Sequence, residues 1–405
     1  MKKRSVIFFI IYLLFSNRLC LPSNAEESNF ILLPDSSNFV RSSLLVTTPG
    51  EEAYSALGHC AIRMECPLHH LDYCFSFEMG DSSATFNYIR FFSGNTPAGF
   101  RAIQTDAYIE EYKHEGRGIK EYELNLDLHQ KQELWRYLDE NMLEGRNRKF
   151  NFIQNNCASM CMIAIEQNTL DENLNIKKWP KQHEMINGEG ICYLTRNAPW
   201  LQFALMSIVG SEADQFWDNE YRISPELIAE TLSQTVLQDM NGNERPMLTG
   251  NVTELSKQSY HSEPAPVTPI IAFSILLLIV IVSTMMEWLF SKKVYSRVLD
   301  IIMMTIQSLA GILLLYMTLV TCMFGLHWNW CLLIFNPFPF IMWIFFHKKK
   351  GFHKVYLFYS IILLCFITLT PLLTCQVISS HRLFASSMLL RCISNYKTKK
   401  DISTH

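Results

Sequence analysis

The sequence predicts an α+β domain outside the cytoplasm that is followed by an all-α bundle of membrane-spanning helices. Three observations lead to this prediction. A signal-like segment opens the chain, strand-like runs and amphipathic helices fill residues 26–239, and long apolar runs follow Pro266.

Residues 1–25 have the pattern of a secretory signal peptide. Basic residues at positions 2–4 precede an apolar stretch from Val6 to Phe15, and Ser23-Asn24-Ala25 supplies a small-x-small cleavage site. The apolar stretch is about ten residues long, whereas a membrane-spanning helix needs roughly 20. We therefore expect a cleaved signal peptide rather than a retained anchor.

Charged residues are divided unequally along the chain. Residues 26–266 contain 35 Asp and Glu against 19 Lys and Arg, whereas residues 267–405 contain 3 against 12. The acidic first part argues against nucleic acid as a partner, because nucleic-acid binding needs a basic surface that displaces counterions from the phosphates. The basic residues of the second part lie between long apolar runs, which is typical of a membrane protein.

The second part contains four apolar runs of about the length that crosses a bilayer. They cover approximately 267–290, 301–324, 328–346 and 355–379. Lysine and arginine gather in the first and third connections but not in the second, so by the positive-inside rule the domain before Pro266 lies outside. A possible fifth helix at 380–395 would bring the basic tail at 396–405 inside, and we prefer five spans to four.

Two features of these runs are polar. Asn336, Pro337 and Pro339 interrupt the third run, which predicts a kink or a break that lines a cavity. Arg382 and Glu287 lie near the predicted ends of spans, where we expect their long side chains to reach the interface.

The periodicity of the outer domain predicts a strand-rich opening and a helical second half. Strands are expected at 40–46, 61–64 and 72–77, and helices at 127–143, 156–166 and within 199–235. Asp127 and Gln130 form a capping box for the first helix, and Asn155 or Asn156 caps the second. Residues 240–266 are polar and contain Gly, Asn, Ser and Pro, so they are expected to form a linker.

Outside the cytoplasm cysteines usually form disulfides. The outer domain contains Cys60, Cys66, Cys74, Cys157, Cys161 and Cys192. Cys66 and Cys74 are candidates for a pair across a hairpin, or for a zinc site with His69 and His70. The spacing of these four residues is irregular for zinc, so we expect no metal and no cofactor.

Cys157 is the candidate nucleophile. It falls in the first turn of the apolar helix, where unpaired amide groups and the helix dipole favour a thiolate. A thiolate can attack an ester carbonyl and hold the acyl group as a thioester, with a histidine as general base. His59, at a predicted loop-to-strand transition, is the best candidate. The structural alternatives are a packed helical cysteine and a polar residue at the start of a strand.

Four runs, in this order, resemble motifs of the Lnb-type lipoprotein N-acyltransferase family. They are residues 47–63 (TTPGEEAYSALGHCAIR), 112–118 (YKHEGRG), 124–126 (LNL) and 155–158 (NNCA). The multi-span C-terminal half resembles the family's membrane domain, so the resemblance covers nearly the whole mature chain. It implies an outer domain similar to circularly permuted papain-like folds, in which histidine precedes cysteine, as His59 precedes Cys157.

The resemblance also implies a function and further site residues. The family's Asn-Tyr-Gly-like run is replaced here by Ser76-Phe77-Glu78, so the base-orienting residue stays open. The candidates for it are Ser76, Asp72 and Glu52, with Asn156, Tyr54 and Ser55 as further supporting residues. Arg63 and Arg117 are candidates for binding a phosphate headgroup, and ion pairing within the fold is the alternative for both.

The expected function is therefore transfer of a fatty acyl chain from phospholipid to the N-terminal amine of lipoproteins through a thioester on Cys157. The expected location is the bacterial inner membrane, crossed several times, with the N-terminal domain in the periplasm. Two alternatives stay open: a cysteine peptidase or amidase of the cell envelope, and a non-catalytic envelope module stabilised by disulfides.

Overall fold

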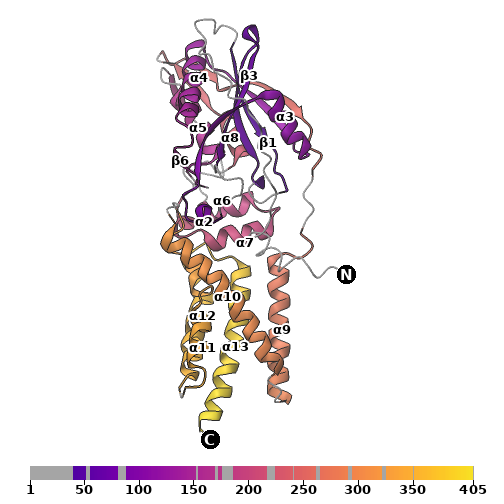
Figure 1. Ribbon diagram of the computed structural model, residues 1–405, viewed down its shortest axis with the longest axis vertical. Helices are drawn as coiled ribbons and strands as arrows, with labels where there is room; N and C mark the ends of the chain where they lie inside the picture. The colour runs from indigo at the N-terminus through magenta and orange to yellow at the C-terminus, as the bar shows by residue number, and fades with distance from the viewer. Residues whose placement is uncertain are drawn as a thin grey trace. The chain divides into compact units, whose positions relative to one another are not determined.

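The computed structural model describes residues 40–51, 55–80, 88–151, 154–168, 172–175, 186–216, 224–239, 241–260, 265–290, 294–321, 325–349 and 351–404 (Figure 1). The chain divides into two compact units, Met1–Trp179 with Asn219–His261, and Pro180–Asp218 with Ser262–His405. The predicted signal peptide lies outside the described residues, as do Glu52 and Tyr54.

The first unit is built on a seven-stranded antiparallel sheet. In spatial order β10, β5, β1, β2, β3, β4 and β6, its strands are Leu248–Ser256, Ile119–Leu124, Arg41–Thr47, His59–Cys66, Leu71–Met79, Pro97–Gln104 and Arg148–Lys149. The strands expected at 40–46, 61–64 and 72–77 correspond to β1, β2 and β3. A second sheet contains β7 (Glu172–Asn175), β8 (Val236–Asp239) and β9 (Glu244–Pro246).

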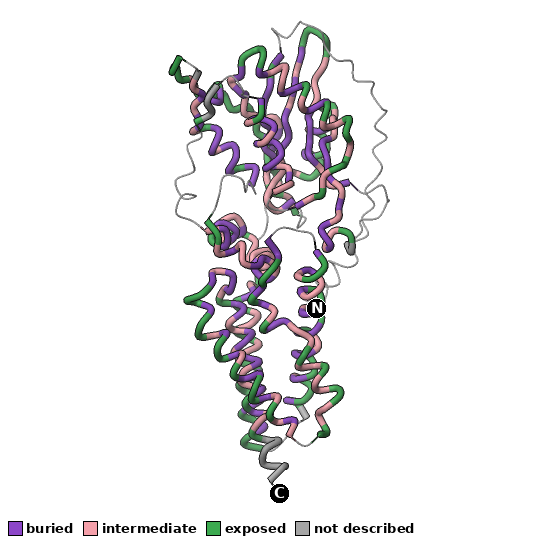
Figure 2. The backbone as a smooth tube through the Cα atoms, turned by 90° about the vertical axis from the view of Figure 1, so that its left-hand side faces the viewer, coloured by how far each residue is buried: buried purple, intermediate pink, exposed green. Residues whose placement is uncertain are grey.

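Helices cover both faces of the main sheet. On one face, α4 (Leu128–Leu143), α5 (Cys157–Gln167) and α8 (Pro225–Ser233) pack around a core that includes Leu44, Ile62 and Phe75. On the other face, Tyr108 and Tyr112 of α3 (Thr105–His114) pack against the sheet. The short elements are η3 (Pro67–His69) and α2 (Tyr88–Phe92). Figure 2 shows buried residues both in strands of the main sheet and in the helices that pack against it.

The predicted helices at 127–143 and 156–166 are present with the expected caps. Asp127 accepts a hydrogen bond from the backbone of Gln130, whose side chain accepts one in return, so the capping box is complete. The helix α5 begins at Cys157 and is capped by Asn156. It is apolar all round because it is buried between the sheet and the neighbouring helices α4 and α8.

Part of the predicted linker is structured. Residues 248–256 form β10, which pairs with β5 at the edge of the main sheet. Composition did not reveal this strand, because an edge strand exposes one face and one side to water and tolerates polar residues and glycine.

The second unit is helical. Its elements are α6 (Asn187–Leu194), α7 (Pro199–Ile208), η4 (Ser211–Asp214), α9 (Pro269–Phe290), α10 (Val294–Val320), η5 (Trp330–Leu333), α11 (Phe338–Phe346), α12 (His353–Leu373) and α13 (Ser379–Thr404). Among the described residues, three helices are long and apolar enough to cross a membrane: 269–290, 295–320 and 353–373. The predicted break in the third run is present, since η5 ends before Asn336 and α11 starts after it.

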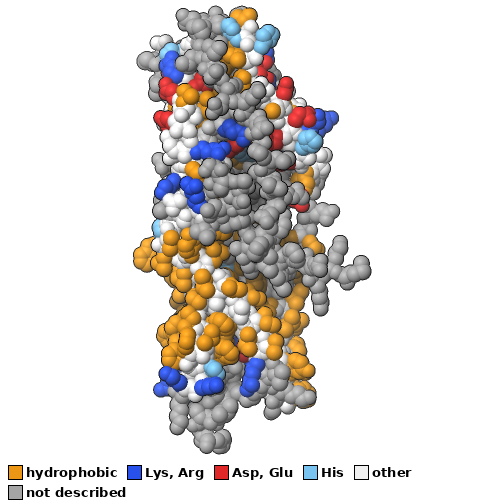
Figure 3. Space-filling model, viewed as in Figure 1, with side chains coloured by type: hydrophobic (Ala, Val, Ile, Leu, Met, Phe, Trp, Pro, Cys, Tyr) orange, Lys and Arg blue, Asp and Glu red, His pale blue; other side chains and the backbone are white. Residues whose placement is uncertain are grey.

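The surface of the helical unit suits a bilayer. Figure 3 shows hydrophobic side chains along its length, with Lys and Arg gathered at one end. Lys348, Lys349 and Lys354 are exposed, as the positive-inside rule expects of a loop that faces the cytoplasm.

The segment from α6 to η4 packs with this bundle, although the sequence places it in the outer domain. Ser207 of α7 lies 2.9 Å from Nε2 of the buried His381, and Asn329 donates hydrogen bonds to the carbonyl groups of Ser207 and Ile208. Gln376 in turn donates to Asn329. This buried network joins the segment to the bundle, and the long sequence separations hide it from local pattern.

Candidate active site

The nucleophile candidate occupies the first residue of α5. Asn156 accepts a hydrogen bond from the backbone of Ser159, and the Ser159 hydroxyl accepts one from the backbone of Asn156. This capping box fixes the start of the helix, so the predicted supporting role of Asn156 takes the form of a cap. Cys157 is half-buried at the end where the free amide groups of the helix favour negative charge.

His59, the first residue of β2, lies within hydrogen-bonding distance of Cys157. Burial is the largest influence and opposes protonation of the imidazole. The negative charge of Cys157, the hydrogen bond to its sulfur and the charge of Glu78 together outweigh burial, so the pKa of His59 is raised. The pKa of Cys157 is lowered well below that of a free thiol, first by a hydrogen bond from Cys60 and then by His59. Together these directions favour a thiolate–imidazolium pair.

Ser76 holds the other side of the imidazole. Its hydroxyl lies 2.7 Å from Nε2 of His59, and the side chain is fully buried on β3, beside β2. Of the three candidates for the base-orienting residue, Ser76 is the one that contacts His59. Asp72 instead accepts hydrogen bonds from Arg63 and Thr105, and Glu52 lies outside the described residues.

Cys60 is a site residue that sequence reasoning missed. Both its thiol and its backbone N–H donate hydrogen bonds to the sulfur of Cys157, and it is also hydrogen-bonded to Cys161. Burial raises the pKa of the Cys60 thiol, so it stays protonated and acts as a donor. The available signal was its position next to His59 in a strand that packs against α5.

Arg63 and Arg117 have different surroundings. Arg63 donates two hydrogen bonds to Asp72, at 2.8 and 2.7 Å, and one to Glu121, at 3.0 Å. It is thereby a structural ion-pair residue that links β2, β3 and β5. Arg117 is 2% exposed and lies near the site, with its guanidinium 4.6 Å from the centre of the Tyr112 ring. The Tyr112 ring stacks on His59 at 5.9 Å.

The loop before His59 is shaped by Ser55. Its carbonyl group accepts hydrogen bonds from the backbone of Gly50 and Gly58, at 3.1 and 2.9 Å. Gly58 has a φ of 84°, and a Cβ there would lie 2.7 Å from the carbonyl oxygen of Thr47. Only glycine fits this turn, which delivers His59 to the start of β2. Ser55 therefore supports the site through the backbone, and Tyr54 lies outside the described residues.

All six cysteines of the predicted outer domain are free thiols, including Cys66 and Cys74. No group of His, Cys, Asp and Glu side chains among the described residues has the arrangement of a metal site. The site is thus assembled from a thiol, an imidazole and their hydrogen-bonding partners.

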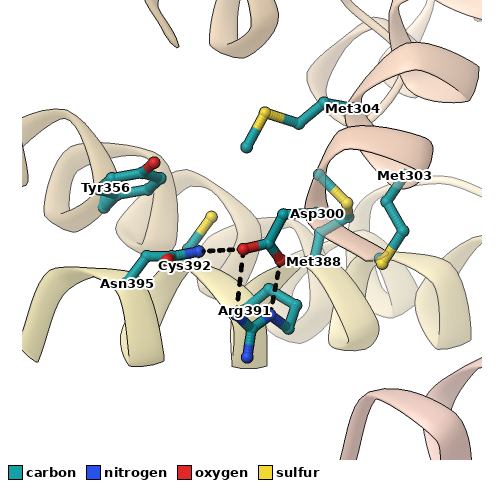
Figure 4. A pocket seen from close by; sticks show the side chains of 8 residues that line it. All are labelled: Asp300, Met303, Met304, Tyr356, Met388, Arg391, Cys392 and Asn395. Carbon is teal, nitrogen blue, oxygen red and sulfur yellow. Dashed lines mark hydrogen bonds and ion pairs between the residues drawn. The ribbon is translucent and has the colours of Figure 1, made fainter. Parts of the chain in front are cut away.

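A second titratable cluster lies inside the helical unit (Figure 4). Arg391 of α13 donates to both oxygens of Asp300 on α10, at 2.6 and 3.0 Å, and to Glu287 on α9, at 3.1 Å. Asn395 also donates to Asp300. The expected snorkelling of Glu287 is wrong: the side chain is 4% exposed because Arg391 satisfies it inside the bundle.

The fold and the site together define a class of membrane protein: an α+β domain with a paired thiol and imidazole, joined to a bundle with long apolar helices. Two family models match the chain, the Lnb N-terminal periplasmic domain over residues 35–186 and the Lnb transmembrane domain over residues 261–401. The chain therefore belongs to the Lnb family, and the predicted resemblance is confirmed. No curated protein and no solved structure matches it.

Family membership confirms the fold class and the coarse location. The chain is a membrane protein whose N-terminal α+β domain is periplasmic and whose C-terminal part is a helical transmembrane domain. Residues 187–260 fall between the two matches and include α6, α7 and β10.

Proposed function

We propose that this protein is an inner-membrane enzyme that transfers a fatty acyl chain from phospholipid to the N-terminal amine of lipoproteins through a Cys157 thioester. The observation that supports it best is the hydrogen-bonded pair of Cys157 and His59, in which the pKa of the thiol is lowered and that of the imidazole is raised. Such a pair supplies a nucleophile at neutral pH without a separate proton-abstraction step.

In the first half-reaction the Cys157 thiolate attacks the carbonyl carbon of a phospholipid ester. The C–S bond forms and the ester C–O bond breaks, so the acyl group stays on Cys157. The departing alkoxide takes the proton of the His59 imidazolium and leaves as lysophospholipid. After this step His59 is neutral and can act as a base.

In the second half-reaction the α-amine of the lipoprotein attacks the thioester carbonyl. Neutral His59 accepts the amine proton, the C–S bond breaks, and an amide forms on the lipoprotein. The thiolate of Cys157 is released beside a protonated His59, which restores the starting pair. Both substrates carry lipid chains, which gives the transmembrane domain a part in presenting them to the site.

Replacement of Cys157 tests this proposal in cells. A Cys157→Ala protein that still inserts into the membrane should leave lipoproteins with a free N-terminal amine, seen as the loss of one acyl mass in lipopeptide mass spectra. Lipoproteins that remain N-acylated in such cells would contradict the proposal. A peptidyl group, rather than a fatty acyl group, on Cys157 would favour the peptidase alternative.

A further inference from the structure

Arg117 is a buried cation with one unsatisfied nitrogen. Its Nε donates to the carbonyl oxygen of Thr48 at 2.7 Å, and its Nη1 donates to Glu115 at 3.0 Å. Among the described residues Nη2 has no hydrogen-bond partner, although it is fully buried. Buried polar groups in native proteins are almost always satisfied, so an unpaired N–H on a guanidinium calls for a ligand.

Three glycines lie close to Arg117 in sequence or in space: Gly50, Gly116 and Gly118. A Cβ at Gly50 would lie 3.1 Å from the Arg117 Cδ, and a Cβ at Gly118 would lie 3.0 Å from the backbone nitrogen of Gln258. Gly116, on the other side of Arg117, has a φ of 70° that glycine adopts without strain. Glycine at position 50 thus lets the backbone approach the Arg117 side chain closely.

Glu115 is an exchangeable counter-ion. The Arg117 side chain is 3% exposed, but that of Glu115 is 44% exposed and makes a single contact with Nη1. An incoming anion that displaces Glu115 would meet both Nη1 and Nη2. A phosphate group suits this geometry, because guanidinium groups bind phosphate through two parallel N–H bonds.

The place of Arg117 connects it to the catalytic pair. Its guanidinium lies over the ring of Tyr112 at 4.6 Å, and that ring stacks on His59 at 5.9 Å. A lipid whose phosphate is bound at Arg117 would therefore have its glycerol esters near Cys157. In Arg63 the corresponding nitrogens already bind Asp72 and Glu121, which leaves no such donor.

We propose that Arg117 binds the phosphate of the phospholipid acyl donor through Nη2 and Nη1, with Glu115 as the carboxylate that the phosphate displaces. This inference rests on the proposed function. It adds the subsite that selects a phosphorylated lipid over a neutral one with the same acyl esters.

The subsite also couples donor binding to catalysis. The positive charge of Arg117 is one of the influences that lower the pKa of His59 and so oppose its protonation. A bound phosphate offsets that charge. Donor binding therefore favours the imidazolium that protonates the leaving alkoxide.

The test compares two donors with the full-length protein in neutral detergent micelles. One is a phospholipid and the other a diacylglycerol with the same acyl chains, and the readout is the rate of acyl-Cys157 formation by intact-protein mass spectrometry. Arg117→Lys keeps a charge but loses the paired donors, and Arg117→Gln loses both. We expect either to slow acylation from phospholipid roughly tenfold to a hundredfold, the effect of one charged hydrogen bond, and to leave acylation from diacylglycerol within about twofold.

A matched control and two further arms complete the experiment. Arg101→Gln removes another guanidinium, bonded to Glu78 at 3.4 Å, and should leave the ratio of the two donor rates unchanged. Glu115→Gln should increase that ratio, because the competing charge is gone. Inorganic phosphate should inhibit the wild-type reaction with phospholipid but not with diacylglycerol.

Equal loss with both donors in the Arg117 variants would show a structural role and overturn the subsite. An unchanged ratio of the phospholipid rate to the diacylglycerol rate in the Arg117→Lys protein would also overturn the subsite. Thermal unfolding checks that this variant is folded. A wild-type protein that forms no acyl-Cys157 from either donor would instead refute the proposed function itself.

Discussion

The hydroxyl of Ser76 lies 2.7 Å from Nε2 of His59. His59 is also hydrogen-bonded to Cys157, so the imidazole contacts one side chain from β3 and one from the start of α5. Ser76 thereby takes the position of the residue that orients the base in thiol enzymes.

Ser76→Ala should lower the rate of acyl transfer about fivefold to tenfold, because about 1 kcal/mol of orienting hydrogen bond is lost. The fall should be in kcat, with little change in KM for the lipid donor. Ser42→Ala is the matched control, since Ser42 is a buried serine of β1 in the same sheet whose hydroxyl has no partner among the described residues. Equal activity of the two variants would remove Ser76 from the mechanism.

Cys157 should react with iodoacetamide at pH values where an ordinary thiol is inert. Its pKa is lowered and that of His59 is raised, so the ion pair exists between the two values and is lost when pH falls below the pKa of Cys157. Cys60→Ala removes the thiol hydrogen bond that contributes most to the lowered pKa of Cys157, so it should shift the alkylation profile to higher pH. An unshifted profile would show that the Cys60 thiol does not stabilise the thiolate. Peptide mapping that compares alkylation of Cys157 with alkylation of the buried Cys161 in the same sample provides the internal control.

Asp139 should destabilise the periplasmic domain at neutral pH. This buried carboxyl group of α4 has one oxygen without a partner among the described residues, and burial raises its pKa to about 7. Because the folded-state pKa is raised, stability falls as pH rises from about 4 to about 7 and is level above that range. Asp139→Asn should therefore raise stability at pH 8, by at most about 4 kcal/mol at roughly 1.4 kcal/mol per unit.

The gain from Asp139→Asn should shrink towards pH 4, where the carboxyl group is protonated in both states. Thermal unfolding at the two pH values measures the gain. Asp127→Asn, which replaces the exposed cap of α4 with another good cap, provides a comparison at an aspartate of the same helix that is not buried. A gain that is the same at both pH values would contradict the raised pKa of Asp139.

Arg391 should be essential for the stability of the transmembrane domain. Arg391→Met leaves Glu287 and Asp300 buried without their cation, a loss of about 3–5 kcal/mol for a broken buried ion pair. Thermal unfolding in detergent should show this loss of stability. Replacing all three together, as Arg391→Met with Glu287→Gln and Asp300→Asn, should restore much of the loss because no unpaired charge remains. A triple variant as unstable as the single one would contradict this account.

Local pattern predicted the elements that position the site but not all of its contacts. The start of α5 followed from Asn156 and the apolar run after it, and the position of His59 followed from the turn before β2. The choice of Ser76 over Asp72 required the register of β2 with β3, which pairs Ser76 with Ala61, two residues after His59 on β2. Cys60 was missed because its role depends on the packing of α5 against β2 rather than on any spacing in sequence.

The same limit explains the errors in domain organisation. The segment from α6 to η4 looks like part of an α+β domain because its helices are short, yet Ser207 contacts His381 at a separation of 174 residues. Strand β10 looks like a linker because its sequence is polar. In both cases distant hydrogen bonds, not composition, decide where the segment belongs.

The most direct test of the central claim is to trap the acyl group on Cys157. Purified protein incubated with phospholipid and no lipoprotein should gain the mass of one fatty acyl group on the peptide that contains Cys157. Neutral hydroxylamine should remove it, as expected for a thioester, and Cys157→Ala should prevent it. An acyl adduct that persists in Cys157→Ala, or a fully folded wild-type protein that transfers acyl chains without ever acquiring one, would contradict the account.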